Sequence, residues 1–451
     1  MLITNNDKTI CAISTAPGVG GIAVIRLSGD LAFKITNKIF SRDVEKCASH
    51  SATFGKISKN NEVVDEVVVT KFSGPNSFTG EDTIEIACHG SQFIQQEILN
   101  LLIKEGCVLA APGEFTLRSY LNGKMDLSQA EAVADLIHSS SKAAHKMAMH
   151  QMRGGFSKDL SELRQKLIDF ASLIELELDF GEEDVEFADR DDLKELVEGV
   201  LAYINKLTDS FSTGNAIKNG VNTVLAGRPN AGKSTLLNTL LNEERALVSD
   251  IAGTTRDTIE ELININGVDF RLIDTAGIRE ASDTIEKMGI EKTLEKINQS
   301  SILLYLYDVN ETSTEEVEKD ISEINSEGNV IIVANKTDKI KDSDSIPNSH
   351  IQISALNKNG IETIKNKLSE EFSEQNLDLE NTIVSNARHF EALNRAKEDL
   401  TKVREGLDIG ITGDFLAMDI RQSLHHLGSI TGEVTADDLL GNIFSNFCIG
   451  K

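Results

Sequence analysis

The sequence has few cysteines and no tract of basic residues. Its five cysteines are an odd number and lie far apart, with no CxxC pair and no histidine cluster at metal-ligand spacing. This pattern favours a protein of the reducing cytosol over one held together by disulfides. No two lysine or arginine residues are adjacent, so the chain lacks the basic tract typical of sequence-independent binding to a phosphate backbone. Any nucleic-acid partner must therefore use a local patch.

Long apolar runs are also missing. The longest, Ile302 to Tyr307, is far shorter than the roughly 20 residues that a membrane helix needs. The amino terminus MLITNNDKTI lacks the charged and apolar pattern of a signal peptide. We therefore expect a soluble, cytoplasmic protein without membrane contact.

What the chain does have is length and negative charge. It contains 451 residues, of which 45 are Lys or Arg and 72 are Asp or Glu, for a formal net charge of −27. At about 150 residues per domain, this length predicts about three domains. The 40% hydrophobic content is enough to give each domain a buried core.

The composition pattern changes several times along the chain. From Thr9 to about Lys124, short β-branched strands between Gly and Pro turns predict an α+β domain. From Met125 to about Gly214 the chain has no proline, and apolar residues recur at steps of four and three, which predicts a helical bundle. The residues of this stripe are Phe156, Leu160, Leu163, Leu167, Phe170 and Ile174.

From Asn222 to about Phe372, strand-like and helical segments alternate, which predicts a mainly parallel sheet. The chain is helical again from about Leu379, with a second apolar stripe at Leu416, Ile420, Leu424 and Leu427. Because neither stripe can bury its face alone, we infer one helical domain into which the α/β unit is inserted. The predicted limits are 1–124 (α+β), 125–215 (helical), 216–378 (α/β) and 379–451 (helical).

Residues 227–234 carry the pattern GxxxxGKS between the apolar strand NTVLA and the helical TLLNTLL. In that setting, successive backbone N–H groups converge on a β-phosphate and Lys233 supplies charge to the β and γ oxygens. The hydroxyl of Ser234 is the expected magnesium ligand. The predicted phosphate-binding residues are Gly227, Asn230, Ala231, Gly232, Lys233, Ser234 and Thr235.

Two further motifs follow in the order that a GTPase needs for its switch loops. Thr254 and Thr255 lie 27 and 28 residues after Gly227, where a threonine hydroxyl can complete the magnesium shell in the presence of a γ-phosphate. A second motif ends the strand FRLID, where a carboxylate can hold magnesium through water and a backbone N–H can contact the γ-phosphate. Its residues are Asp274, Thr275, Ala276 and Gly277.

Two more motifs predict selectivity for guanine. A carboxylate at Asp338 can accept both N–H groups of the guanine edge, which adenine lacks, and backbone N–H groups after the strand IQIS can contact the base. The two motifs are Asn335-Lys336-Thr337-Asp338 and Ser354-Ala355-Leu356. Together the motifs predict a guanine-nucleotide switch with GTP as ligand.

The site departs from a Ras-like GTPase at two positions. Ile278 follows Gly277, so the glutamine that orients the attacking water in Ras is absent and another group must orient it. Asn230 fits two roles about equally well. Its amide either helps to hold a monovalent cation between the phosphates or stabilises the loop itself.

Several stretches resemble the MnmE (TrmE) family of tRNA wobble-uridine modification GTPases. They are GRPNAGKSTLLN, SDIAGTTRD, DTAGIREASDTIEKMGIE, PNSFTGEDTIE, APGEFTLRSYLNGKMDLSQAEAVADLI, IAVIRLSG and the carboxyl-terminal FCIGK. The resemblance covers essentially the whole chain. The GTPase motifs alone would allow the wider group that also contains Era and EngA.

The resemblance implies metal ligands and a further catalytic residue in the GTPase domain. It implies magnesium at Ser234 and Thr255, and a water-orienting role for Glu286 beside Lys233 and Asn230. A potassium site is implied at Asn230, Ser249, Ile251 and Thr254, within a loop that also supplies Asp250, Ala252 and Gly253 to GTP. The family often has threonine where Ser249 stands, which matters only if the side chain is the ligand. Potassium-dependent pairing of two such domains would link hydrolysis to movement of the helical domains.

The amino-terminal region resembles a tetrahydrofolate-binding domain. The resemblance implies constitutive homodimerisation and a 5-formyltetrahydrofolate-type one-carbon donor held by Arg26, Glu85, Lys124 and Lys451. Which residue contacts which end of the folate stays open. So does the role of Cys448, because a cysteine there is either a small apolar filler or a functional thiol.

The resemblance implies that the GTPase works with the FAD- and NADH-using protein MnmG. Together they would install an aminomethyl or carboxymethylaminomethyl group on carbon 5 of the wobble uridine. The alternative is a regulatory GTPase of ribosome assembly of the Era or EngA type. Nothing after Phe372 resembles the GXXG loop of a KH module, which favours the first hypothesis. Because the chain is acidic, we expect tRNA affinity to come largely from the complex, with a local patch here at most.

Overall fold

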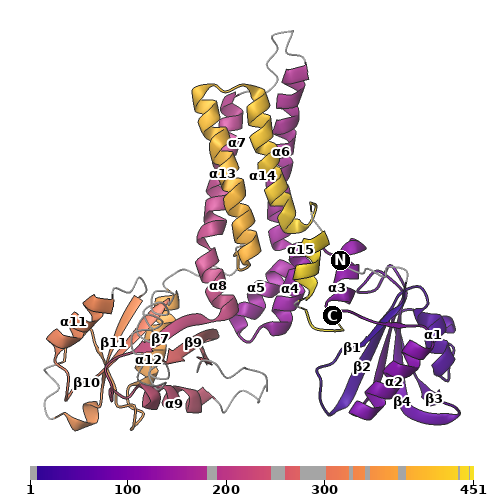
Figure 1. Ribbon diagram of the computed structural model, residues 1–451, viewed down its shortest axis with the longest axis horizontal. Coiled ribbons are helices and arrows are strands. Elements are labelled where there is room, and N and C mark those ends of the chain that lie inside the picture. The colour runs from indigo at the N-terminus through magenta and orange to yellow at the C-terminus, as the bar shows by residue number, and fades with distance from the viewer. Residues whose placement is uncertain are drawn as a thin grey trace, which may run out of the picture. The chain divides into compact units, whose positions relative to one another are not determined.

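Figure 1 shows the computed structural model of the protein, which describes residues 8–179, 190–244, 260–274, 301–324, 329–340, 346–373, 382–434, 437–445 and 447–450. Contacts within the chain divide it into two units, each assembled from separate stretches of sequence. The first unit comprises residues 1–134, 151–198 and 398–451, and the second comprises 135–150 and 199–397. The predicted fold class is confirmed, because the chain combines an α+β region, long helices and an α/β region.

The amino-terminal region is a six-stranded mixed sheet in the order β3-β4-β5-β2-β1-β6. Neighbouring strands are antiparallel, except for the parallel pair β1 and β6. The strands are β1 Ile10–Ile13, β2 Gly20–Ser28, β3 Ser51–Lys59, β4 Glu62–Phe72, β5 Thr83–Gly90 and β6 Val108–Leu109. Helices α1 (Ala32–Ile39) and α2 (Gln92–Lys104) cover one face of this sheet (Figure 1).

Side chains alternate along β2 and β5 between the buried core and the opposite face of the sheet, where a candidate site lies. Ile25 and Leu27 of β2, and Ile84 and Ile86 of β5, are fully buried in the cluster beneath the two helices. Successive side chains of a strand point to opposite faces. The residues between them, Arg26 and Glu85, therefore point away from this core.

A buried arginine joins three segments of the amino-terminal region. Helix α3 (Glu114–Leu121) carries Arg118, whose guanidinium is 2% exposed and donates to Glu81 (3.1 Å) and Glu114 (2.9 Å). It also donates to the backbone carbonyl of Lys8 (3.0 Å), while the hydroxyl of Ser28 donates to Glu81 (2.7 Å). The network therefore fixes the end of the loop between β4 and β5 against α3 and β2.

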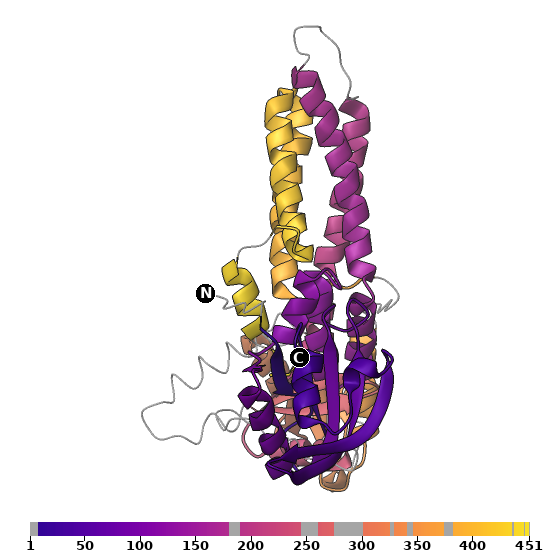
Figure 2. The ribbon, with the colours of Figure 1, turned by 90° about the vertical axis from the view of Figure 1, so that its right-hand side faces the viewer.

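Two long helices from distant stretches of the sequence pack together in the first unit. They are α6 (Gly155–Asp179) and α14 (Gly413–Thr431), which lie side by side in both views (Figures 1 and 2). Both predicted stripes are buried as expected, apart from two half-buried leucines, Leu163 and Leu424. The two apolar stripes, from distant stretches of the sequence, therefore lie within one unit.

The second unit contains the α/β region, a six-stranded sheet in the order β12-β11-β10-β7-β9-β8. All neighbours are parallel except the β8–β9 hairpin. The strands are β7 Val221–Ala226, β8 Glu260–Ile265, β9 Val268–Asp274, β10 Ile302–Asp308, β11 Asn329–Asn335 and β12 Ile351–Gln352. The helices are α9 Lys233–Glu244, α11 Thr314–Ile324 and α12 Ile361–Ser373, with a 3-10 turn at Thr337–Lys339. Two separate apolar clusters cover the two faces, as in other sheets built from βαβ units.

The amino-terminal region also contains a 3-10 turn at Val44–Lys46. The remaining helices are α4 Leu127–His138, α5 Lys142–Met152, α7 Arg190–Asp209, α8 Phe211–Asn219, α13 Ala387–Ile409 and α15 Asp437–Ser445. None of the helices that the structure describes is long and apolar enough to span a lipid bilayer.

We expect Arg118→Met to destabilise the amino-terminal region by about 3–5 kcal/mol, because it leaves the carboxylates of Glu81 and Glu114 without their cation. Lys56→Met is the matched control, since Lys56 pairs with Glu66 at the surface (3.3 Å), where ion pairs contribute about 1 kcal/mol or less. Urea unfolding followed by hydrogen exchange of α3 measures both changes. Equal stability of the two variants would contradict a structural role for the buried pair.

Candidate functional site

The phosphate loop has the predicted strand-loop-helix setting, with β7 before it and α9 after it. Two of its glycines adopt left-handed backbone conformations, Gly227 at φ 142° and Gly232 at φ 99°. A Cβ at Gly227 would lie 1.9 Å from the carbonyl oxygen of Leu306, and one at Gly232 would lie 2.3 Å from Nδ2 of Asn335. Only glycine fits at either position, so the loop backbone approaches β10 and β11 directly.

Lys233 is the first residue of α9 and closes the loop. Its side chain is buried, and its Nζ donates to the carbonyl oxygens of Gly227 (2.8 Å) and Arg228 (3.0 Å). The ammonium group therefore lies at the helix amino terminus, where free backbone N–H groups also favour an anion. Ser234 and Thr235 follow it in the first turn and are exposed. This arrangement can bind a phosphate chain.

The neighbouring Arg228 is directed elsewhere. Its guanidinium donates to Asp320 (2.7 Å) and Glu316 (2.9 Å) of α11. Hydrogen bonds to these two carboxylates raise the pKa of the guanidinium, and the bond to Asp320 contributes more than the bond to Glu316. Arg228 thus ties the loop to α11, a contact between distant segments that the sequence motifs do not indicate.

Asn335 connects the phosphate loop to the segment after β12. Its side chain is 2% exposed, and Nδ2 donates to the carbonyl oxygen of Ala231 (2.8 Å). Its Oδ1 accepts from the backbone N–H of Ala355 (3.0 Å). The hydroxyl of Thr239 in α9 also donates to the carbonyl oxygen of Ala355 (3.1 Å). These hydrogen bonds therefore hold the phosphate loop against the Ser354-Ala355-Leu356 motif, although the two lie more than a hundred residues apart in sequence.

Asp338 and Ser354 meet at the edge expected to hold the base. The hydroxyl of Ser354 donates to Oδ1 of Asp338 (2.6 Å). Asp338 is exposed. Ser354 and Ala355 are buried, whereas Leu356 is 76% exposed. The carboxylate is thus oriented by one hydrogen bond and remains accessible to a ligand, as recognition of the guanine edge requires.

Lys336 joins the Asn335-Lys336-Thr337-Asp338 motif to the end of β10. Its backbone is left-handed (φ 63°), and its Nζ lies 2.6 Å from Oδ2 of Asp308 at the end of β10. Burial by itself raises the pKa of Asp308. Hydrogen bonds from Lys336 and Asn310 outweigh burial and hold that pKa below its usual range. The sequence motif assigns Lys336 to the nucleotide site, and the structure adds this buried partner.

Some predicted residues of this site lie outside the portion of the chain that the structure describes. Asp274 ends β9, where its backbone lies beside Leu225 of β7, so the strand leads toward the phosphate loop. Asn230 is exposed and left-handed (φ 62°). The predicted residues of this site outside the description are Ser249, Asp250, Ile251, Ala252, Gly253, Thr254, Thr255, Thr275, Ala276, Gly277 and Glu286. Lys451, predicted to bind the folate, also lies outside the described residues.

A second group of predicted residues meets in the amino-terminal sheet. Arg26 and Glu85 face each other in register on β2 and β5, and Nε and Nη2 of Arg26 lie 3.0 and 2.8 Å from the same oxygen of Glu85. The guanidinium also lies over the rings of Phe78 (5.6 Å) and Phe115 (5.7 Å). The planar guanidinium thus contacts both the carboxylate of Glu85 and two aromatic rings.

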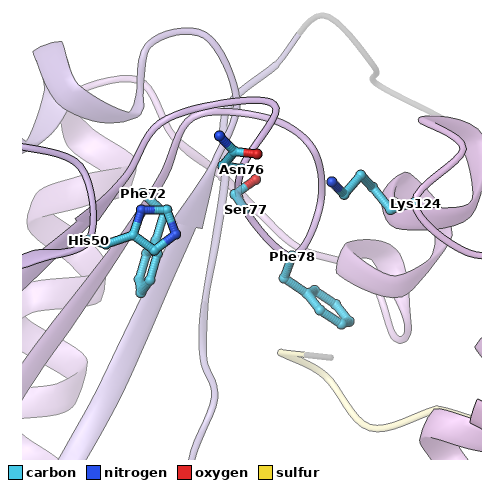
Figure 3. Close-up of a pocket in the computed structure, with 6 residues that line it drawn as sticks. All are labelled: His50, Phe72, Asn76, Ser77, Phe78 and Lys124. Atoms are coloured by element: carbon cyan, nitrogen blue, oxygen red, sulfur yellow. The ribbon is translucent and has the colours of Figure 1, made fainter. Parts of the chain in front are cut away.

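Lys124 lines a hollow of about 320 Å³ that adjoins this pair through Phe78. The lining residues are His50, Phe72, Asn76, Ser77, Phe78 and Lys124 (Figure 3). Nζ of Lys124 donates to the carbonyl oxygen of Pro75 (2.9 Å), in the loop that carries Asn76 and Ser77. Sequence analysis missed the aromatic residues, although Phe78 stands within the quoted stretch PNSFTGEDTIE.

The carboxyl-terminal tail lies against the same region of the first unit. The backbone carbonyl of Cys448 accepts from Gly113 (3.4 Å), and that of Gly450 accepts from the hydroxyl of Ser14 (3.1 Å). A Cβ on Gly450 would lie 2.4 Å from the carbonyl oxygen of Ile13. The thiol-bearing residue Cys448 is exposed. The tail therefore runs beside β1, the strand paired with β2 that carries Arg26.

Comparison with known proteins identifies the family of the chain. The family model of the MnmE helical domain matches residues 127–448, and that of the GTP-binding protein TrmE amino terminus matches residues 9–124. Among solved structures, Era of Aquifex aeolicus bound to GDP.AlF4− is 24% identical, with 40% of this chain and 66% of that chain covered at a TM-score of 0.28. That score is too low to carry an argument.

Curated relatives match the chain from end to end. The tRNA modification GTPase MnmE of Cytophaga hutchinsonii is 52% identical, with 100% of this chain and 99% of the relative covered. The same-named proteins of Christiangramia forsetii (99% and 99% covered) and Parabacteroides distasonis (98% and 100% covered) are each 51% identical. The chain therefore belongs to the MnmE family of tRNA modification GTPases, and it hydrolyses GTP in tRNA modification.

Proposed function

We propose that the protein is a potassium-stimulated GTPase that modifies carbon 5 of the tRNA wobble uridine together with the FAD protein MnmG. The product carries an aminomethyl or carboxymethylaminomethyl group, and a 5-formyltetrahydrofolate-type folate donates the carbon. The observation that supports this proposal is the presence of two separate sites in one chain. A phosphate loop with a base-recognition carboxylate lies in the second unit, and the Arg26–Glu85 pair lies in the first.

In the nucleotide site, each proposed role follows from the chemistry of the group. Lys233 and the N–H groups of the loop hold the β- and γ-phosphates, and Asp338 accepts from the guanine edge. Ser234 and Thr255 would hold magnesium, which would supply positive charge to the phosphates when bound. Buried Asn335 keeps the phosphate and base ends of the site at a constant separation, because it bonds to both.

We assign potassium to Asn230, Ser249, Ile251 and Thr254, and water orientation to Glu286. The exposure of Asn230 within the phosphate loop supports this assignment, because its side chain is accessible to a ligand. These residues would hold a monovalent cation, which would supply positive charge beside the phosphates.

In the folate site, the Arg26–Glu85 pair offers donors and an acceptor at one spot. The aromatic ring of Phe78 can stack on a flat ligand, and Lys124 offers a cation for its carboxylate. The described part of the carboxyl-terminal tail ends at Gly450, whose carbonyl oxygen accepts from Ser14, and we assign the next residue in sequence, Lys451, to the folate as well.

Three proposals concern organisation. The chain works as a homodimer in the cytoplasm, and tRNA binds largely through the complex with MnmG. Its domains are an α+β domain of residues 1–124, a helical domain formed by 125–215 and 379–451, and the inserted GTPase domain 216–378. The alternative function is a regulatory GTPase in ribosome assembly of the Era or EngA type.

Deleting the gene distinguishes the two functions. We expect tRNA from the deletion strain to carry wobble uridine without its group at carbon 5, and ribosome profiles to stay normal. Nucleoside analysis of total tRNA by mass spectrometry measures the first, and sucrose gradients measure the second. Normal wobble nucleosides together with accumulated ribosomal precursors would support the assembly function instead.

Replacement of Asn230 tests the potassium site. Asn230→Gly keeps the left-handed backbone and removes only the amide, so we expect GTP affinity to change little. Wild-type turnover should be about tenfold or more faster in potassium than in sodium at equal ionic strength, and the variant should lose this difference. Loss of GTP affinity in the variant would instead assign the amide to loop stability.

Replacement of Lys124 tests the folate site. We expect Lys124→Met to weaken binding of 5-formyltetrahydrofolate about tenfold or more, the effect of removing one charge-assisted hydrogen bond. Isothermal titration measures the affinity, and GTP turnover without tRNA should not change. Lys104→Met, at an exposed position in α2, is the matched control. Equal affinities of both variants would exclude Lys124 from the site.

A further inference from the structure

A basic segment lies outside both sites. Between Asp135 and Asp159 the sequence contains no Asp or Glu, although the chain has 72 acidic residues and a net charge of −27. Within this interval stand four Lys or Arg residues and three histidines, namely His138, Lys142, His145, Lys146, His150, Arg153 and Lys158. Helix α5 occupies the middle of the segment, as labelled in Figure 1.

Packing separates the two faces of α5. Ala143, Ala144 and Met147 are buried in the same apolar core as Ile263 and Ile265 of β8. Lys142, His145 and Lys146 are exposed. Residues three and four apart share a face of a helix, so these three side chains form one surface, called here the basic face of α5.

Hydrogen bonds hold the amino-terminal end of α5 in this orientation. The backbone N–H of Ala143 donates to the carbonyl oxygen of Gly267 in the β8–β9 turn (3.3 Å). The hydroxyl of Ser140 donates to the carboxylate of Asp269, which is 7% exposed and also accepts from Asn264 (2.6 Å). The basic face is therefore fixed outward rather than free to turn into the core.

The charges of this face are not neutralised within the described chain. No ion pair there joins Lys142, His145 or Lys146 to a carboxylate, whereas Lys218 nearby pairs with Asp135 (2.8 Å). Lys142 and Lys146 are four residues apart on one helix, where like charges repel each other and destabilise the helix. A polyanionic partner would remove this cost.

We propose that the basic face of α5 binds the sugar-phosphate backbone of tRNA. This inference rests on the tRNA modification activity of the family. Lysine ammonium groups and an imidazole N–H suit phosphate oxygens, and contacts of this kind do not depend on base sequence. The exposed positions of α5 carry no large apolar side chain, which the core of a protein interface or a membrane-surface helix would need.

The position of α5 connects this surface to the nucleotide site. Its buried face rests on β8, and the hairpin partner β9 ends at Asp274 beside the strand before the phosphate loop. Bound tRNA would thus contact a helix that packs on the GTPase sheet itself. The rest of the acidic surface would not need to attract RNA.

Charge removal at the basic face tests the proposal. In the full-length protein, Lys142→Gln combined with Lys146→Gln should weaken binding of an unmodified tRNA transcript about tenfold or more at 100 mM salt. The slope of log affinity against log salt should become less steep by about 2. Fluorescence anisotropy measures both quantities, and GTP turnover without tRNA should stay at the wild-type rate.

Lys206→Gln combined with Lys319→Gln is the matched control, because it removes two exposed helical lysines from the same unit. Equal effects of the two double variants, or no effect of either, would overturn the proposal. A photo-crosslinking phenylalanine analogue at position 145 should form an adduct with tRNA in the complex. An adduct with protein alone would overturn it as well.

Complementation of the deletion strain separates this proposal from the proposed function. The wild-type gene should restore the wobble nucleosides, and the gene with both lysine changes should restore them only partially. Full restoration by both genes would overturn the role of α5 and leave the function intact. Failure of the wild-type gene to restore them would count against the proposed function itself.

Discussion

The side chain of Asn335 is the contact on which the nucleotide site depends. It is buried at the end of β11, and its amide bonds to the phosphate loop on one side and to Ala355 on the other. Both atoms of the amide are used, so the loss of either contact leaves a buried polar group without its partner. Neighbouring contacts reinforce this connection, because Lys233 closes the loop and Thr239 holds Ala355 from α9. The carboxylate of Asp338 can therefore be positioned relative to the phosphates before any ligand binds.

The chain has a net charge of −27 although it acts on RNA, which is also an anion. Cations placed at a few positions provide its anion-binding sites. Arg26 is paired with Glu85, Arg118 with two carboxylates, and Lys233 with loop carbonyls, so each is oriented by its contacts. The basic face of α5 is different, because its cations lie on a fixed helix without a carboxylate partner among the described residues. An acidic protein can thus bind anions at selected places while the rest of its surface repels them.

Much of the architecture was predictable, because its signals are local. Strands follow from short β-branched runs, and the buried stripes of α6 and α14 follow from helical spacing. The phosphate loop was recognisable because its glycines, Lys233 and Ser234 are adjacent in sequence. The Arg26–Glu85 pair, the ring of Phe78 beside it and the ties of Arg228 to α11 were not predictable as contacts, since each joins segments 50 or more residues apart.

The sequence by itself determined the family, the chemistry of the nucleotide site and the alternation of its elements, because each depends on residues close together in the chain. Only the tertiary structure decided which groups meet. Strand register placed Arg26 opposite Glu85, close backbone approach required glycine at 227, and packing on β8 turned the lysines of α5 outward. Such choices depend on long-range pairing, in which one residue of shift reverses the face that a side chain presents.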